Sequence, residues 1–176
     1  MDRFLEEIVV KKNRTANEVM YILSMVVLVL SGLYALLMLQ MLFYAFDVPT
    51  LVITVLSAGV AVGLFLFRDR LRTEYEYTFT NGDLDFAMVF NNSKRKSLGS
   101  LKVRNVEAFG PVTGAAFNRY VSMQGVKKDN WFLNRGSNLY YFYFSKESNK
   151  RLIVIEPSEE MVGYIKAYLP HGVYQE

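Results

Sequence analysis

Two pairs of carboxylates stand two residues apart in the sequence, Glu74 with Glu76 and Asp83 with Asp85. If both segments are extended, each pair lies on one face of a strand, because successive side chains point to opposite faces. Paired carboxylates can act as general acid and base or hold a cation. Each pair alternates with apolar residues, however, and the polar face of a half-buried strand is normally in water. We therefore predict no catalytic residues and no enzyme activity.

Other residue types that support catalysis or metal binding are scarce. The chain has no Cys and one His, so disulfides, thiolate catalysis and cysteine-ligated metals are excluded. His171 follows Pro170 in the C-terminal tail and is a poor candidate for a catalytic base. The glycines lack the spacing of a phosphate-binding loop. We predict no bound metal and no cofactor.

Basic residues form two clusters that point to an anionic ligand. One follows the second apolar run of the chain, and the other lies in a predicted polar loop. Residues 68–176 carry 16 Lys and Arg against 12 Asp and Glu, a net charge of +4. The candidates for binding an anionic lipid headgroup are Arg68, Arg70, Arg72, Lys94, Arg95 and Lys96.

Each cluster has two interpretations. A basic residue held close to an anionic leaflet contributes about 1 kcal/mol to binding. Alternatively, the arginines only fix the orientation of membrane spans, which is the favoured interpretation for them, and Lys94–Lys96 only aid solubility. Nucleic acid is not an expected partner, because the aromatic residues fall mainly on inward-facing strand positions rather than on a basic face.

Two long apolar runs precede these residues. Val19–Phe46 contains no charged residue and is about 42 Å long as a helix, and Val48–Phe67 is about 30 Å long. The hydrocarbon core of a bilayer is about 30 Å thick. Only Asp47 is charged between residues 19 and 67, and Pro49 fits the first turn of the second helix. We predict a transmembrane hairpin over residues 19–67, with spans over 19–46 and 48–67.

The orientation of this hairpin follows from its basic flanks. Lys and Arg residues near the ends of the spans resist translocation. They precede the first run and follow the second, and the connecting turn has none. Both termini are therefore expected in the cytoplasm, with the protein in the inner membrane.

Residues 1–18 are expected to form a short amphipathic helix before the first span. Phe4, Leu5, Ile8 and Val9 recur at helical spacing. This helix would lie either in the headgroup plane or on the cytoplasmic domain, and the sequence favours neither.

Gly59 and Gly63 form a GxxxG pattern in the second span and are candidates for helix packing. Such a face lets another helix approach closely. The neighbour is either a second copy of the chain, which gives a homo-oligomer, or the first helix of the same hairpin at Ser31, Gly32 and Ala35. The second alternative is favoured.

From residue 73 onward the pattern changes to period two, which is typical of strands. Asn81-Gly82 predicts a tight hairpin turn, because both residues accept a positive φ. Residues 110–136 are expected to form an irregular connection with a short strand at 120–123. A final hairpin over 139–155 and an amphipathic helix ending at Pro170 complete a predicted domain of residues 73–176.

Five consecutive aromatic residues occupy one predicted strand of this domain. Their side chains must alternate between the two faces of the sheet, so both faces need a cover. The cover is either a second layer of the same domain, the favoured alternative, or a protein partner. The partner-face candidates are Tyr140, Tyr141, Phe142, Tyr143 and Phe144.

The order of these elements resembles that of the bacterial pleckstrin-homology-like (PH-like) membrane proteins, mostly of unknown function. The resemblance rests on two spans, a strand ending at Asn81-Gly82, a strand over Leu101–Glu107, a late hairpin and a closing helix, and it covers residues 19–169. It implies an α+β membrane protein in which a transmembrane hairpin precedes an antiparallel β split barrel capped by a C-terminal helix. The irregular stretch 110–136 departs from this pattern.

These features lead to two hypotheses about function. The first is a membrane-anchored module for protein interaction or self-assembly, acting through an exposed sheet edge and the aromatic face. The alternative is recognition of an anionic lipid headgroup at the inner leaflet through residues 94–96.

Overall fold

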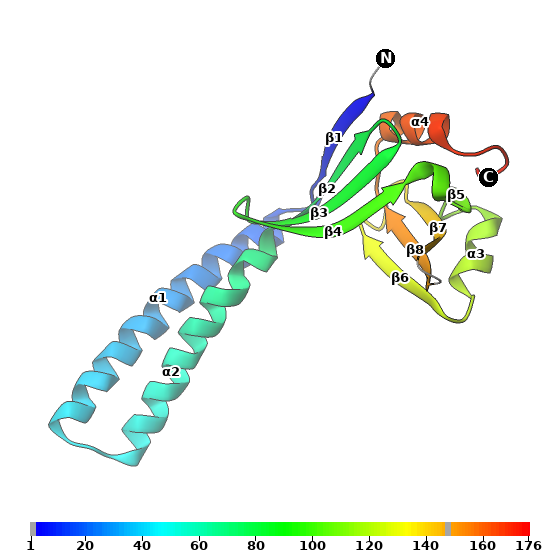
Figure 1. Cartoon of the computed structure of the whole chain (residues 1–176). Coiled ribbons are helices and arrows are strands. Elements are labelled where there is room, and N and C mark those ends of the chain that lie inside the picture. The colour runs from blue at the N-terminus through cyan, green and yellow to red at the C-terminus, as the bar shows by residue number, and fades with distance from the viewer. Residues whose placement is uncertain (1–2, 147–148) are drawn as a thin grey trace. The chain divides into compact units, whose positions relative to one another are not determined.

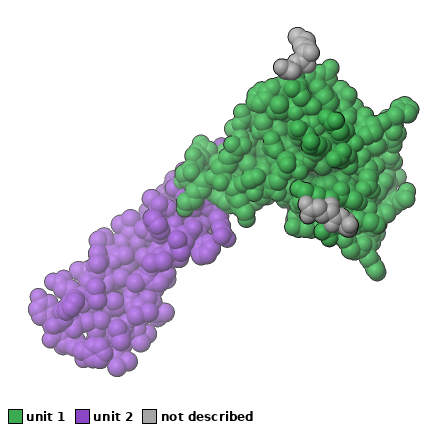
Figure 2. Space-filling model, viewed as in Figure 1, with its two compact units in different colours: residues 1–12, 74–176 green, residues 13–73 purple. Residues whose placement is uncertain are grey.

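The computed structural model describes residues 3–146 and 149–176, and the chain divides into two compact units (Figure 2). The first unit, the sheet domain, comprises residues 1–12 and 74–176, and the second, the helical hairpin, comprises residues 13–73. The chain therefore leaves the sheet domain soon after its first residues and returns to it after the hairpin.

The helical hairpin contains two long helices, α1 (Thr15–Tyr44) and α2 (Val48–Phe67), followed by a short 3-10 helix, η1 (Arg68–Arg72) (Figure 1). By length and composition, both long helices could cross a membrane. The predicted pair of long apolar helices is thus confirmed. Between them, the Asp47 carboxylate accepts a hydrogen bond from the Thr50 backbone N–H at 2.9 Å, which caps the start of α2.

The N-terminal segment is a strand, β1 (Phe4–Val9), and the predicted amphipathic helix is wrong. The strand pairs antiparallel with β2 (Thr73–Thr80), from Phe4 opposite Thr80 to Val9 opposite Tyr75. Apolar residues at 4, 5, 8 and 9 fit a helix locally, but β2 offers backbone groups that need partners. Pairing also buries Val9 in the core, whereas Phe4 and Ile8 remain 61% and 60% exposed.

The first sheet has the strand order β1-β2-β3-β4, with β3 at Asp83–Phe90 and β4 at Lys94–Lys102. The predicted hairpin turn is confirmed, since Asn81 has φ 49° and Gly82 has φ 94°. A bulge between Phe86 and Ala87 lets Gly99, at φ 129°, stand opposite Phe86.

The second sheet has the order β5-β7-β8-β6, comprising β5 (Ala108–Pro111), β6 (Val126–Trp131), β7 (Tyr140–Lys146) and β8 (Asn149–Ile155). The stretch 110–136 is therefore ordered, with helix α3 (Ala115–Val121) where a short strand was expected. Strand β6 was not predicted, because its polar residues Lys127–Asn130 are typical of a loop. It pairs parallel with β8, so the second sheet is mixed rather than wholly antiparallel.

One hydrophobic core lies between the inner faces of the two sheets and the closing helix α4 (Glu159–Tyr168) (Figure 1). Ser158 caps α4 through the Met161 backbone N–H at 3.1 Å, and Met161 and Ile165 are fully buried. A second, smaller cluster lies on the other face of the second sheet, under α3. Each face of the second sheet is thus covered from within the chain.

Candidate functional site

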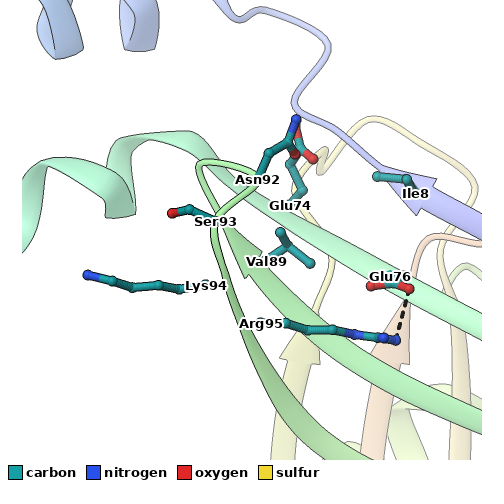
Figure 3. A pocket seen from close by; sticks show the side chains of 8 residues that line it. All are labelled: Ile8, Glu74, Glu76, Val89, Asn92, Ser93, Lys94 and Arg95. Atoms are coloured by element: carbon teal, nitrogen blue, oxygen red, sulfur yellow. Dashed lines mark ion pairs between the residues drawn. The ribbon is translucent and has the colours of Figure 1, made fainter.

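A pocket of about 280 Å³ lies on the outer face of the first sheet (Figure 3). All four strands of this sheet, with the β3–β4 turn, surround it. Its lining residues are Ile8, Glu74, Glu76, Val89, Asn92, Ser93, Lys94 and Arg95. The pocket therefore gathers one predicted carboxylate pair and two of the predicted basic residues.

The pocket lies at the end of the sheet where the chain enters from the helical hairpin. Glu74, the first residue of the returning chain, is on its rim. The tight turn beside it uses the left-handed backbone conformation at Asn91 and Asn92, with φ 48° and 51°, which asparagine tolerates better than most residues.

Lys94, Arg95 and Lys96 begin strand β4, and the expectation that they lie in a loop is wrong. They stand opposite Phe90, Val89 and Met88 in that order. Because side chains alternate along a strand, Arg95 points to the face opposite that of Lys94 and Lys96. Figure 3 shows Arg95 reaching Glu76 while Lys94 points away from that pair. The three cations therefore do not form one cluster, although all three are exposed.

Glu76 lies on the outer face of β2, yet only 8% of it is exposed. Its Oε1 forms an ion pair with Arg95 Nη2, at a distance of 2.8 Å. Burial raises the pKa of the Glu76 carboxyl and neighbouring Glu6 raises it too, whereas Arg95 acts in the opposite direction. The expectation that this carboxylate pair lies in water is therefore wrong for Glu76, and Glu74 is half-buried.

Asp83 and Asp85, the second carboxylate pair, are exposed as expected. Within residues 3–146 and 149–176, no group of three His, Cys, Asp or Glu residues is arranged to hold a metal ion. Two carboxylates line the pocket, and of its two basic lining residues Arg95 reaches Glu76 whereas Lys94 points away from that pair (Figure 3).

The arginines of the first cluster lie in η1, within the other unit. Arg72 Nη2 is 2.5 Å from Glu18 Oε2, and its guanidinium lies 3.8 Å from the centre of the Tyr21 ring. Arg68 lies 3.8 Å from Asp69, and Arg70 is exposed beside Phe67. Two of the three therefore have anionic partners within the hairpin.

Gly59 and Gly63 do not make the close approach expected within the hairpin. A Cβ atom built on either glycine would meet no atom within 4 Å, and the same holds for Gly32 on the other helix. The buried residues of the two helices are instead Ala35 and Thr54. The surface of α2 at Gly59 and Gly63 therefore has space beside it in the described structure.

The aromatic strand is β7, and four of its five aromatic residues are buried. Phe142 and Phe144 face the core between the sheets. Tyr141 and Tyr143 face α3, where Tyr120 lies 5.7 Å and 4.6 Å from their ring centres. These four side chains are therefore covered within the domain, and Tyr140 is half-buried.

Asn134 joins the N-terminal segment to the second sheet through hydrogen bonds that could not be predicted from the sequence. Asn134 Nδ2 donates to the Val10 carbonyl at 2.9 Å and to Glu156 Oε1 at 2.9 Å. Asn134 Oδ1 accepts the Lys12 backbone N–H at 2.7 Å. No local signal joins residues 122 positions apart, so only the fold could reveal this contact.

Together these features define an α+β chain with two long apolar helices inserted between the first two strands of a two-sheet domain. A family model described as a bacterial PH-like domain (DUF6106) matches residues 1–175. The chain belongs to this bacterial PH-like family, whose function is unknown. No curated protein and no solved structure matches the chain.

Proposed function

We propose that the protein is a two-span inner-membrane protein whose PH-like domain, a split barrel of two sheets, binds anionic lipid headgroups in the cytoplasm. The apolar helices support the membrane anchor, because only 6% of the apolar window of each is buried within the chain. An exposed apolar surface of that size is unfavourable in water.

The pairing of β1 with β2 supports an even number of crossings. These strands flank the helical hairpin in the sequence. They pair with each other along their length, from Phe4 opposite Thr80 to Val9 opposite Tyr75. Both ends of the hairpin must therefore lie on one side of any membrane that it enters. Two crossings meet this requirement, and the basic flanks favour the cytoplasmic side.

The observation that carries the lipid proposal is the short length of chain between the end of α2 and the part of the sheet where Lys94 and Lys96 lie. Lys94 shares a pocket with Glu74. Six residues lie between Glu74 and Phe67 at the end of α2, and this stretch of chain is no longer than about 25 Å. Both lysines are exposed, and each contributes about 1 kcal/mol when close to an anionic leaflet.

The experiment uses the absence of cysteine from the chain. Ser93→Cys in the β3–β4 turn accepts a single fluorophore, and the full chain is placed in nanodiscs that carry a headgroup quencher. We expect stronger quenching with phosphatidylglycerol than with phosphatidylcholine alone, and weaker quenching in high salt. The double variant K94Q/K96Q should lose most of the phosphatidylglycerol effect.

The matched control is Lys102→Gln, which removes an exposed lysine from the other end of the same strand. It should leave the quenching unchanged. Equal quenching in both lipid mixtures would contradict headgroup recognition.

Self-assembly is the second candidate function, and the open face at Gly59 and Gly63 supports it. A helix of a second copy could approach closely there. We expect the full chain to form a dimer in mild detergent and the G59L/G63L variant to be monomeric, as measured by light scattering. A wild-type monomer would count against this function.

A further inference from the structure

A second pocket, with a volume of about 340 Å³, lies at the end of the second sheet where β7 begins. One part of its lining is apolar and consists of Pro111, Val112, Leu139 and Tyr140. The other part is polar and consists of Thr113, Arg135, Ser137 and Asn138. We call this site the turn pocket, because residues of two turns of the chain line it.

The two turns are the segments Pro111–Gly114 and Asn134–Ser137. In each, the backbone N–H of the fourth residue donates to the carbonyl of the first, at 3.0 Å and 3.2 Å respectively, which is the hydrogen bond of a β-turn. The pairing of β5 with β7 places Pro111 opposite Tyr140. Strand pairing therefore brings the two turns to the same end of the sheet, although they are far apart in the sequence.

The turn that carries Arg135 is held in place by Asn134. The Asn134 backbone N–H donates to Glu156 Oε2 at 3.0 Å, and Asn134 Nδ2 donates to the Val10 carbonyl at 2.9 Å. Glu156 is only 9% exposed, so the turn is anchored to the interior of the domain. The backbone of Arg135 is thus fixed beside the pocket, while its exposed side chain can turn toward a ligand.

Arg135 is the only charged residue among the described residues that line the turn pocket. Within residues 3–146 and 149–176, no acidic residue forms an ion pair with it. This holds for Glu176 as well, whose backbone lies beside Gly114. The far end of β7, at Lys146, is about 20 Å from Tyr140 along the extended strand. The positive charge of the pocket is therefore available to an anion.

Ser137 offers a second donor. Its hydroxyl oxygen is buried and has no hydrogen-bond partner among the described residues. Buried polar groups are nearly always paired, and an unpaired one is unfavourable. Because Ser137 lines the pocket, a change of its χ1 rotamer turns the hydroxyl toward a ligand. This rotation breaks no hydrogen bond of the side chain, and an acceptor on the ligand satisfies the hydroxyl.

We propose that the turn pocket binds a small organic acid through its carboxylate or phosphate group. The Arg135 guanidinium presents a planar fork of donors that matches either oxyanion, and the Ser137 hydroxyl donates a further hydrogen bond. Val112, Leu139 and the Tyr140 ring contact the apolar part of the ligand.

The size and composition of the pocket agree with this class of ligand. Pockets for small molecules have volumes of about 300–1,000 Å³ and combine an apolar lining with a few polar groups. The turn pocket has both properties. It shares no lining residue with the pocket of the first sheet, so this proposal does not depend on the lipid proposal.

The experiment places the full chain in phosphatidylcholine nanodiscs and follows para-fluorophenylacetate by fluorine NMR. We expect saturable binding that weakens with added salt. The neutral analogue para-fluorophenylacetamide should bind about tenfold more weakly, the effect of losing one charge-assisted hydrogen bond. Para-fluorophenyl phosphate is measured in the same way, and the tighter of the two anions identifies the acidic group that the pocket prefers.

Variants test the two donors separately. Arg135→Gln should weaken binding of the preferred anion about tenfold, and Ser137→Ala should weaken it about threefold. The thermal unfolding temperature of S137A should not fall, because the hydroxyl has no partner to lose in the free chain.

The matched control is Arg104→Gln, which removes an exposed arginine that does not line the pocket. It should change the affinity by less than about twofold. An absence of saturable binding of both anions, an equal loss in R104Q and R135Q, or an unchanged affinity in S137A would overturn the proposal. The K94Q/K96Q variant should retain its affinity for the probe whatever its behaviour on lipid.

Discussion

The two basic regions of the sheet domain differ in how sequence distance relates to spatial distance. Lys94–Lys96 are consecutive, but strand alternation separates their side chains, and Glu76 neutralises Arg95 at 2.8 Å. Lys127 and Lys146 are 19 positions apart in the sequence, yet the pairing of β6, β7 and β8 places both, with Arg151, along one groove of the second sheet. The pairing of strands therefore determines the local charge more than a run of basic residues does.

The largest expected effect comes from disturbing the second sheet, which carries Lys127 and Lys146. Leu152 of β8 is 1% exposed and packs in the cluster under α3. Leu152→Ala should lower the free energy of unfolding by about 2–4 kcal/mol, because a buried leucine leaves a cavity when it is shortened. Chemical unfolding followed by the fluorescence of the single tryptophan, Trp131 of β6, measures this loss.

Leu98→Ala serves as its counterpart in the first sheet. Leu98 is half-buried on β4, so its truncation should cost about 1 kcal/mol. If L152A were no less stable than L98A, the second sheet would not be the well-packed scaffold that the comparison requires.

A smaller effect is expected from the ion pair between Asp129 and Arg151 in the second sheet. Asp129→Asn should lower the free energy of unfolding by about 1–2 kcal/mol, because it leaves a half-buried Arg151 without its carboxylate. Asp85→Asn, on an exposed carboxylate of the first sheet, should not change the free energy of unfolding. Equal stability of D129N and the wild type in chemical unfolding would contradict a stabilising role for the Asp129–Arg151 ion pair.

The smallest effect concerns Glu76 in the pocket of the first sheet, and it is seen in how the stability of the chain depends on pH. The pKa of Glu76 is raised above its ordinary value of 4.5, so the folded chain holds this proton more tightly than the unfolded chain does. The resulting stabilisation is complete below the ordinary pKa and is lost as the pH rises through the raised pKa. The stability of the wild type relative to E76Q should therefore fall with rising pH above 4.5.

Chemical unfolding of both proteins over a pH series measures this difference. Glu74→Gln, the same change two residues away, is the matched control. A difference between wild type and E76Q that stays constant with pH would contradict the raised pKa.

Elements with a strong local pattern could be predicted from the sequence. The two apolar helices, the Asn81-Gly82 turn, the late hairpin and helix α4 each depend on residues that are close together in the chain. Strands β1 and β6 could not be predicted, because each is stabilised by a distant neighbour rather than by its own pattern. For β1, the apolar spacing favours a helix, and only pairing with the edge of β2 makes the segment a strand.

The candidate site was predictable only in part, for a similar reason. The charges of Lys94, Arg95, Glu74 and Glu76 are plain in the sequence, but the Arg95–Glu76 pair depends on the register of β2, β3 and β4. The position of Lys127 beside Arg151 depends on the parallel β6–β8 pairing, which no local pattern indicates. In both cases the sequence identifies the charges, and the fold decides which of them meet.

The placement of the helical hairpin between β1 and β2 has a consequence for biosynthesis. A ribosome completes β1 before the helices and β2 after them, so the first sheet cannot form until 63 residues separating Val9 from Thr73 have been made. The pairing of β1 with β2 must also wait until the start of α1 and the end of α2 lie side by side. Formation of the helical hairpin is therefore a step that the pairing of β1 with β2 must await, and a chain whose two helices failed to come together would leave the β2 edge unpaired.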